Sequence, residues 1–368
     1  MSAFACMDCG LTFNSRNKLF FHLRVCLHKR LEASSTSFTE GQNLDVLLSS
    51  QDVRIYVCGG RLRNRTLQSC EYYSFKEQQW FDAPSLVENR GSHGCSVIDN
   101  CLYIVGGGGL HSNLNTCEVL QIDENENENF CLLPSIMNTT SHALATTCHL
   151  PSRSIFSIGG WKDGSMCLNT VERLDIDTKT WTLLSNRMNV ARRLHSCCTL
   201  QNKLYVFGGQ IDANKPGTDQ EWVTDSAECY DLTINEPIDD NNGKDNGDAG
   251  KRTGWQRINN MPIASITACV SIEDLGLIYV FLQTQNKVYR YLPESDEYIA
   301  LCKLPLKQWY GFTVTTLGTK IFLMGGITNG TWTNSFFEFD ILSNTFKELP
   351  SMKQERRRCA SGLVVLSI

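Results

Sequence analysis

The chain has 368 residues, 42% of them hydrophobic and 20% charged, with a formal net charge of −5, so most of it can bury a core. No apolar run approaches the roughly 20 residues of a membrane span, and the first residues lack the basic and apolar regions of a secretory signal. The 17 cysteines are an odd number, and several fall inside expected strands, as cysteines in reducing compartments do. We therefore predict an intracellular protein, cytoplasmic or nuclear or both, without disulfides and without a membrane partner.

The first predicted unit covers residues 1–30, which carry a net charge of +4 against −9 for the remainder. Its two cysteines and two histidines follow the spacing C-x2-C-x12-H-x5-H: Cys6, Cys9, His22 and His28. Phe13 and Leu19 fall where a small core is needed. This pattern resembles the Cys-Cys-His-His zinc finger, a ββα unit. The resemblance implies one structural zinc ion, because so short a unit has too little core to fold without metal.

The fourth zinc ligand has an alternative. Cys26 lies four residues after His22, on the same helical face, whereas His28 lies within the permitted spacing and is favoured. The finger is also a poor DNA reader, because the positions that usually contact bases fall at Ser15, Lys18 and Phe21, and phenylalanine is a poor base reader. A single finger buries too little surface for strong specific binding, so any nucleic-acid binding would be weak.

After a predicted linker at 31–53, an internal repeat runs to the end of the chain. Five apolar strands end in a glycine pair, and a sixth keeps the strand but loses the glycines: 55–60, 102–107, 155–160, 204–209, 321–326 and, without glycines, 278–283. An aromatic residue follows each strand: Trp80, Phe130, Trp181, Trp255, Tyr298 and Phe346. The interval from each aromatic to the next glycine-pair position is 26, 29, 27, 27 and 27 residues. A period of this kind is typical of repeat folds.

The best-preserved unit reads TVERLD at 170–175, then Trp181, then RRLHSC at 192–197. It resembles the kelch-repeat family, and the resemblance covers residues 54–368. The family's fold is a propeller of four-stranded blades. The resemblance predicts that the glycine pairs turn the chain out of a strand with positive φ, and that the aromatic residues fill the space between blades.

Ring closure follows from the strand order. If the strands are called A to D from the axis outward, six copies of strand A are expected: 94–98, 143–148, 196–200, 267–272, 312–316 and 360–366. The first glycine-pair strand has no strand A before it, and the last strand A has no strand B after it. We therefore predict that residues 358–368 complete the first blade, which removes the open sheet edges. The predicted fold is mainly β: a six-bladed kelch propeller closed by its C-terminal strand and preceded by a zinc finger.

The two faces of this ring differ in charge. The B–C and D–A loops are rich in arginine, whereas the C–D loops carry acidic stretches at 123–128 and 236–254, the second of which should be disordered. The predicted partner-binding residues lie in the basic loops: Arg61, Arg63, Arg65, Trp161, Arg192, Arg193, Trp309, Tyr310, Trp332, Arg356, Arg357 and Arg358. An arginine before strand A can instead pack between blades, and Arg192 and Arg357 are the first candidates for that role.

No phosphate loop or nucleophile elbow occurs. His93, His142 and His195 recur at the start of strand A, so packing explains them better than metal binding does. We expect a non-enzymatic adaptor without a small-molecule substrate, which binds protein partners, among them an acidic or phosphorylated segment. The alternatives are a zinc-finger regulator that binds nucleic acid, and a substrate-recognition subunit of a ubiquitin ligase recruited without a BTB domain.

Overall fold

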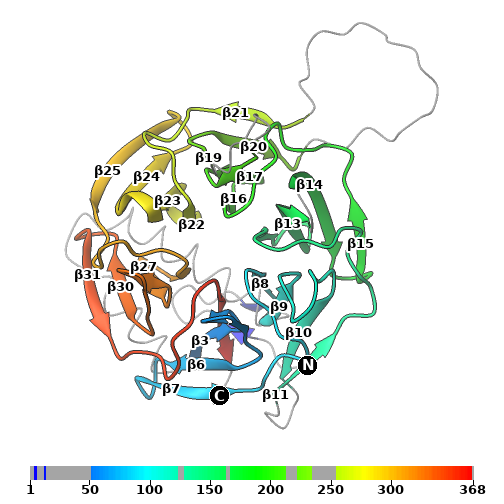
Figure 1. Cartoon of the computed structure of the whole chain (residues 1–368), viewed down its shortest axis with the longest axis vertical. Helices are drawn as coiled ribbons and strands as arrows, with labels where there is room; N and C mark the ends of the chain where they lie inside the picture. The colour runs from blue at the N-terminus through cyan, green and yellow to red at the C-terminus, as the bar shows by residue number, and fades with distance from the viewer. Residues whose placement is uncertain are drawn as a thin grey trace, which may run out of the picture.

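The computed structural model describes residues 51–122, 128–162, 166–212, 222–233 and 254–366, together with two short strands, β1 (Phe4–Ala5) and β2 (Thr12–Phe13). The main part is a ring of six four-stranded antiparallel sheets around an axis, a six-bladed β-propeller (Figure 1). The predicted mainly β fold is therefore confirmed. Two short 3₁₀ helices, η1 (Glu273–Leu275) and η2 (Gln283–Gln285), lie in the fifth blade.

Each blade runs from an inner strand A to an outer strand D. In blades I to III these strands are β32 (Ala360–Leu366), β3 (Asp52–Cys58), β6 (Cys70–Ser74) and β7 (Gln79–Ala83); β8 (Gly94–Ile98), β9 (Cys101–Val105), β10 (Cys117–Ile122) and β11 (Glu128–Leu132); and β12 (Ala145–His149), β13 (Ser154–Lys162), β14 (Met166–Asp175) and β15 (Thr180–Leu183). In blades IV to VI they are β16 (Ser196–Leu200), β17 (Lys203–Phe207), β20 (Ala227–Asp231) and β21 (Gln256–Ile258); β22 (Thr267–Ile272), β23 (Leu277–Leu282), β24 (Lys287–Leu292) and β25 (Glu297–Lys303); and β26 (Thr313–Leu317), β27 (Lys320–Met324), β30 (Phe336–Asp340) and β31 (Thr345–Leu349).

The ring closes as predicted. β32 pairs with β3 from Asp52↔Leu366 to Cys58↔Ala360, so the C-terminal strand completes blade I. Consecutive A strands contact one another all the way round, in the order β8, β12, β16, β22, β26, β32 and back to β8. Four A strands have the expected bounds, whereas β12 and β26 begin two residues and one residue later than expected.

The five glycine pairs adopt positive φ at both positions, as expected. At Gly59 the φ is 56°, and a Cβ atom there would lie 2.6 Å from the carbonyl oxygen of Arg90. Only glycine fits a turn with both of these properties. In blade V, where Leu282 and Gln283 replace the glycines, the chain enters η2 instead.

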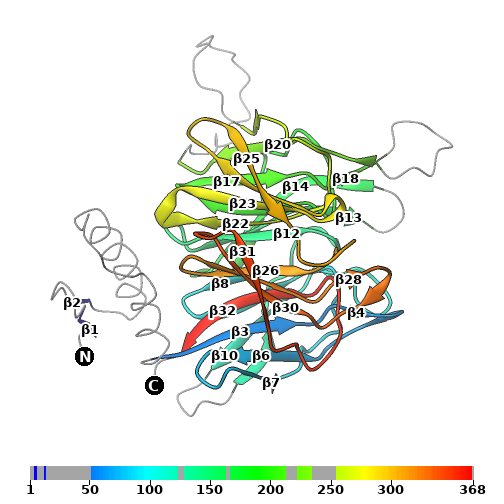
Figure 2. The same cartoon turned by 90° about the vertical axis from the view of Figure 1, so that its left-hand side faces the viewer.

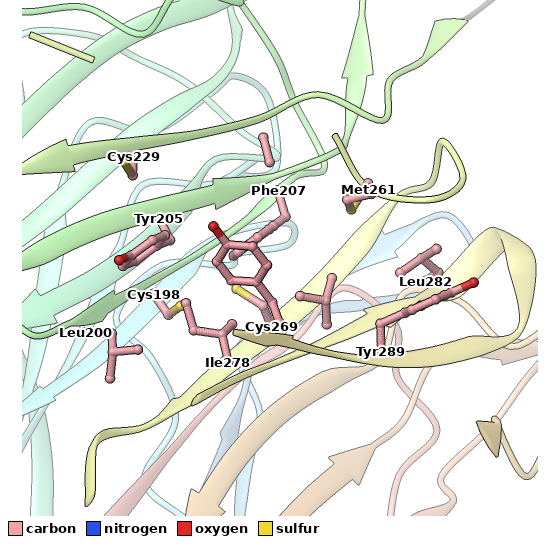
Figure 3. Close-up of a cluster of buried hydrophobic side chains, with 13 residues drawn as sticks. Cys198, Leu200, Tyr205, Phe207, Cys229, Met261, Cys269, Ile278, Leu282 and Tyr289 are labelled. Carbon is pink, nitrogen blue, oxygen red and sulfur yellow. The ribbon is translucent and has the colours of Figure 1, made fainter. Parts of the chain in front are cut away.

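Six apolar clusters form the core, one at each junction between neighbouring blades. Figure 3 shows the junction of blades IV and V, where Tyr205 and Phe207 of β17 face Cys269 and Ile278 of the next blade. The aromatic residue in or directly before each D strand joins such a cluster. Trp80, for example, packs on Phe336 of blade VI with ring centroids 5.2 Å apart. The expectation that these aromatics fill the space between blades is confirmed.

The B–C and D–A loops emerge together at one end of the ring, which we call the loop face. Three short ribbons lie in the B–C loops: β4 (Arg61–Leu62) with β5 (Arg65–Thr66), β18 (Gln210–Ile211) with β19 (Trp222–Val223), and β28 (Ile327–Thr328) with β29 (Thr331–Trp332). Figure 2 shows β4, β18 and β28 at the same end of the propeller. Most of the acidic stretches at 123–128 and 236–254 lies outside the described residues, which include only Glu128 and Gly254 of them.

Candidate functional site

The loop face is held together by backbone bridges. In five blades the residue after strand B's turn pairs with the residue three positions before strand A: Arg61↔Arg357, Gly108↔Gly91, Trp161↔His142, Gln210↔Arg193 and Ile327↔Tyr310. Each bridge is held by reciprocal backbone hydrogen bonds, which fix the backbone from which these side chains leave. Five positions of the loop face are therefore held in place by backbone pairing.

A chain of hydrogen bonds links neighbouring blades at the mouth of the axial channel, from blade VI through blade I to blade IV. The amide nitrogen of Arg358 donates to Gly311 (2.6 Å), and the chain of bonds continues through Ser92, Ala143 and Leu194. All five residues have positive φ. In blade V the side chain of Gln283 takes part instead, because its Oε1 accepts from the amide of Gly311 at 2.6 Å.

The mouth encloses a cavity of about 210 Å³. Every blade contributes to its lining: His93, Ala145, Ser196, Thr267, Thr313 and Ser361 are examples. Arg358 and Tyr310, both predicted partner-binding residues, also line it. The cavity therefore joins the loop face to the axis.

Three arginines of the loops are buried and structural. Arg90, Arg192 and Arg356 are each 0–1% exposed and each pairs with a buried glutamate of strand C: Glu118 at 2.7 Å, Glu228 at 2.6 Å and Glu71 at 2.7 Å. Each guanidinium also donates to the carbonyl of the first glycine of a pair, at 2.9 Å. A buried ion pair with several hydrogen bonds of this kind positions its loop.

This finding corrects two predicted partner-binding residues. Arg192 and Arg356 cannot reach a partner, because their guanidinium groups are buried between strands and already bonded. Arg192 was the expected exception, but the second exception is Arg356 and not Arg357. All three buried arginines lie four residues before strand A, a spacing that could have identified them from the sequence.

Trp309 is also corrected. It occupies the same place in blade VI, four residues before β26, and is 0% exposed. Its indole nitrogen donates to the carbonyl of Gly325 at 2.7 Å, the bond that an arginine makes in blades I, II and IV. The glutamate is replaced too, because Phe337 stands there and its ring centroid lies 5.5 Å from that of Trp309. An aromatic pair thus substitutes for the ion pair.

The remaining predicted residues lie on the loop face. Arg63 and Arg65 are exposed on the β4–β5 ribbon, whereas Arg61 and Tyr310 are half-buried. The guanidinium of Arg193 lies 4.6 Å from the ring centroid of Trp161, and Arg357 lies 5.5 Å from Trp332. Cations stacked on aromatic faces in this way lose little freedom when they bind an anion.

Sequence reasoning missed three exposed apolar side chains on this face. Leu110, Met166 and Trp222 are 68%, 62% and 52% exposed; Leu110 and Trp222 come from the B–C loops of blades II and IV, and Met166 is the first residue of β14 in blade III. Neighbouring loops contact one another, since Cys167 donates its amide to Asp212 at 2.8 Å. Their signal in the sequence is a large apolar residue between the glycine-pair turn and the body of strand C.

The titratable groups beside the channel are packed. Burial, aided by Arg90 and Arg192, lowers the pKa of His93 and His195 to about 3. Burial raises the pKa of Cys359 to about 12 and raises those of Cys95 and Cys197 as well. Within the described residues, no group of three or more histidine, cysteine, aspartate or glutamate side chains is placed to hold a metal ion.

The predicted zinc ligands lie outside the described residues: Cys6, Cys9, His22, His28 and the alternative Cys26. The flanking strands are described, and β1 pairs with β2 antiparallel in the register Phe4↔Phe13 and Ala5↔Thr12. A ββα finger begins with such a hairpin. The zinc site stays a prediction. Among the described residues, no helix has both the length and the apolar character needed to span a membrane.

Comparisons with known proteins agree with the repeat pattern. The family model of the KLHDC2/KLHL20/DRC7 Kelch-repeats domain matches residues 12–209, more than half of the chain, and the Kelch motif model matches 191–236 and 308–353. Kelch-like protein 35 of Mus musculus is 25% identical over 363 residues, 97% of this chain and 54% of that protein. Kelch domain-containing protein 3 of Rattus norvegicus is 30% identical over 139 residues, 36% of this chain and 35% of that protein.

The chain thus spans about half the length of Kelch-like protein 35. The match to residues 12–209 covers part of the N-terminal region and the glycine-pair strands of blades I to IV. The ring closure and the repeats point the same way. The chain belongs to the KLHDC2/KLHL20/DRC7 Kelch-repeats domain family.

Proposed function

We propose that this chain is a non-enzymatic adaptor: its loop face binds an acidic segment of a protein partner, and its N-terminal unit binds one zinc ion. The observation that carries the first part is the pair of arginine–tryptophan stacks, Arg193 on Trp161 and Arg357 on Trp332. Arginine presents a planar fork that matches a carboxylate or phosphate with two hydrogen bonds. Holding that fork in place beforehand reduces the entropy cost of binding.

The surroundings of these stacks suit a protein segment. Leu110, Met166 and Trp222 offer apolar contacts on the same face, and large apolar and aromatic side chains are the usual anchors of interfaces. A segment that combines acidic and apolar residues would therefore use both parts of the face. The proposed ligand is therefore a protein segment with both acidic and apolar residues, and not any anion.

The non-enzymatic part of the proposal has its own support. The raised pKa of Cys95 and Cys197 keeps these channel thiols protonated, and the thiolate is the reactive form. His93 and His195 lie beneath the glycine pairs, since a Cβ at Gly59 or Gly159 would lie 2.9 Å or 2.8 Å from an imidazole carbon. These side chains act as packing groups of the repeat.

The test of partner binding uses an array of short acidic and phosphorylated peptides, each beside a neutral version with Asn and Gln. Peptides selected by the full chain are titrated by fluorescence anisotropy. Charge reversal at Arg63 and Arg193 together should weaken binding at least tenfold, because each charge-assisted hydrogen bond contributes about 1.5–3 kcal/mol. Glu294→Lys, on an exposed C–D loop of the opposite face, is the matched control and should leave binding unchanged.

Two results would contradict the proposal. One is a full chain that binds the neutral peptides as tightly as the acidic ones. The other is binding that survives the Arg63 and Arg193 reversal and is lost in Glu294→Lys, which would move the site to the opposite face. Nucleic acid retained by the finger alone would favour the regulator alternative.

The zinc part is tested separately by metal analysis of the purified chain. One equivalent of zinc is expected, and replacing Cys6 and Cys9 with serine should abolish it, because thiolates supply half of the ligand set. His28→Ala should weaken zinc binding more than Cys26→Ala does. Stoichiometric zinc in the double serine variant would refute the assignment, and the reverse ranking of the two alanine variants would make Cys26 the fourth ligand.

A further inference from the structure

Two arginines of the loop face stand directly opposite each other. The amide of Arg61 donates to the carbonyl of Arg357 at 2.8 Å, and the amide of Arg357 donates back at 3.0 Å, so the two side chains leave neighbouring backbone positions. Like charges directly across a ladder are destabilising. Among the five bridges of this kind, the other four pair glycine with glycine, tryptophan with histidine, glutamine with arginine, and isoleucine with tyrosine. A pair of like charges at this bridge is therefore unusual among the five, and the backbone pairing itself does not require it.

Nothing in the described part of the chain neutralises this pair. No ion pair involves Arg61 or Arg357 among the described residues. Three donors there are buried and lack a hydrogen-bond partner in the same part of the chain: Arg61 Nε, Arg357 Nε and Trp332 Nε1. Burial and the nearby Arg357 lower the pKa of Arg61. Buried donors left unpaired are costly and call for an acceptor.

The side chains are also held in place. Gly91 and Gly108 of blade II form a surface on which Arg61 lies, because a Cβ at these positions would come within 2.6 Å of its Cγ and 2.7 Å of its Nη2. Arg357 is held by Trp332 at 5.5 Å. Two rigid cations with unmet donors make a preorganised site and not a pair of solvated side chains.

We propose that Arg61 and Arg357, with the indole N–H of Trp332, form a seat for one oxyanion, a carboxylate or a phosphate, carried by the partner's acidic segment. This inference rests on the proposed function and places the bound charge at the junction of blades VI, I and II. The anion supplies acceptors for the unmet donors and offsets the repulsion between the guanidinium groups. Repulsion between the two guanidinium groups then destabilises the unbound protein, but it leaves the site preorganised for an anion.

The first test uses inorganic phosphate as the probe and thermal unfolding of the full chain as the readout, with sodium chloride matched for ionic strength. We expect phosphate to raise Tm by about 2 °C or more, because a ligand that binds only the folded state stabilises it. Arg61→Gln and Arg357→Gln should each lose this shift. Lys307→Gln, which removes an exposed charge from the D–A loop before β26, should keep it.

The unliganded variants give a second readout. Arg357→Gln removes the repulsion, so its Tm in buffer without phosphate should equal or exceed that of the unchanged chain. An arginine with a purely structural role would give the opposite sign. A Tm that falls by several degrees without phosphate, together with a phosphate shift that stays, would overturn the proposal.

The second test separates the seat from the proposed function. Peptides selected by the array are made with phosphoserine, glutamate or serine at one central position, which distinguishes phosphate from carboxylate as the bound group. Arg61→Gln and Arg357→Gln should weaken the charged versions at least tenfold and leave the serine version unchanged. If both variants bind normally while Arg63 and Arg193 reversal abolishes binding, the seat is wrong and the proposed function stands. If phosphate binds but no peptide does, the seat stands and the proposed function fails.

Discussion

Arginines that are neighbours in the sequence differ in burial and in bonding partners in this propeller. Arg356 is 1% exposed and bonded to Glu71, whereas Arg357, the next residue, lies half-buried on the loop face against Trp332. Arg192 and Arg193 repeat the contrast with Glu228 and Trp161. The backbone decides which of the two environments each arginine occupies, because one position is buried beside strand C and the next lies on the loop face against a tryptophan. Charge on a loop is therefore no guide to binding until the register of that loop is known.

The largest loss of stability is expected when the buried arginine of two neighbouring arginines is replaced. Arg356→Met should destabilise the protein by about 3–5 kcal/mol, because it leaves Glu71 charged, 1% exposed and without its cation. Arg357→Met, one residue along, should change stability by less than about 1 kcal/mol. Urea unfolding of both variants measures the difference. Equal losses would remove the contrast between the two positions.

In blade VI, the buried arginine–glutamate pair can be introduced by mutation in place of Trp309 and Phe337. Trp309→Arg alone buries an unpaired guanidinium, and Phe337→Glu alone buries an unpaired carboxylate, so each should be strongly destabilising. Together they rebuild the ion pair of blades I, II and IV, and we expect a favourable coupling of about 2–3 kcal/mol in a double-mutant cycle. Additive losses would show that the aromatic pair and the ion pair are not interchangeable solutions of one position.

These residues show what the sequence could and could not predict. The period of the glycine pairs and aromatics located all six blades and the closing strand β32, because blade geometry repeats at nearly constant spacing. The buried arginine of blade I was misplaced by one residue, because three consecutive arginines hide which one lies four residues before strand A. Trp309 was misplaced because an aromatic residue had replaced the arginine that marks this position in other blades. The pairing of Arg61 with Arg357 depends on a contact between residues 296 positions apart, which no local pattern reveals.

The buried histidines predict a pH effect of intermediate size. The pKa of His195 is about 3 in the folded protein, against about 6.5 in an unfolded chain. Between these values the unfolded state binds the extra proton, so stability is complete above the unfolded pKa and is lost as pH falls below it. His195 should therefore contribute a loss of about 2 kcal/mol between pH 7 and pH 5.

The measurement compares urea unfolding at the two pH values for the unchanged chain and for His195→Gln. The variant should lose less stability on acidification, by the share that belongs to His195. His111→Gln, at an exposed position on a B–C loop, is the control and should follow the unchanged chain. An identical pH response in all three proteins would show that His195 is not kept neutral by burial.

The smallest expected effect on stability comes from the stack of Arg193 on Trp161. It distinguishes a tryptophan that supports ligand binding from one that stabilises the core. Trp161→Leu removes the ring beneath Arg193 and its edge contact with His142, whose centroid lies 5.1 Å away. A cation–π contact at a half-exposed site contributes about 0.5–1 kcal/mol, so unfolding should change little. Affinity for the acidic peptides should nevertheless fall by roughly three- to tenfold, because the guanidinium loses its fixed orientation and must be ordered when the ligand binds. A loss of stability above about 2 kcal/mol with unchanged affinity would make Trp161 a core residue, and the contrast between neighbouring arginines would then lie in packing alone.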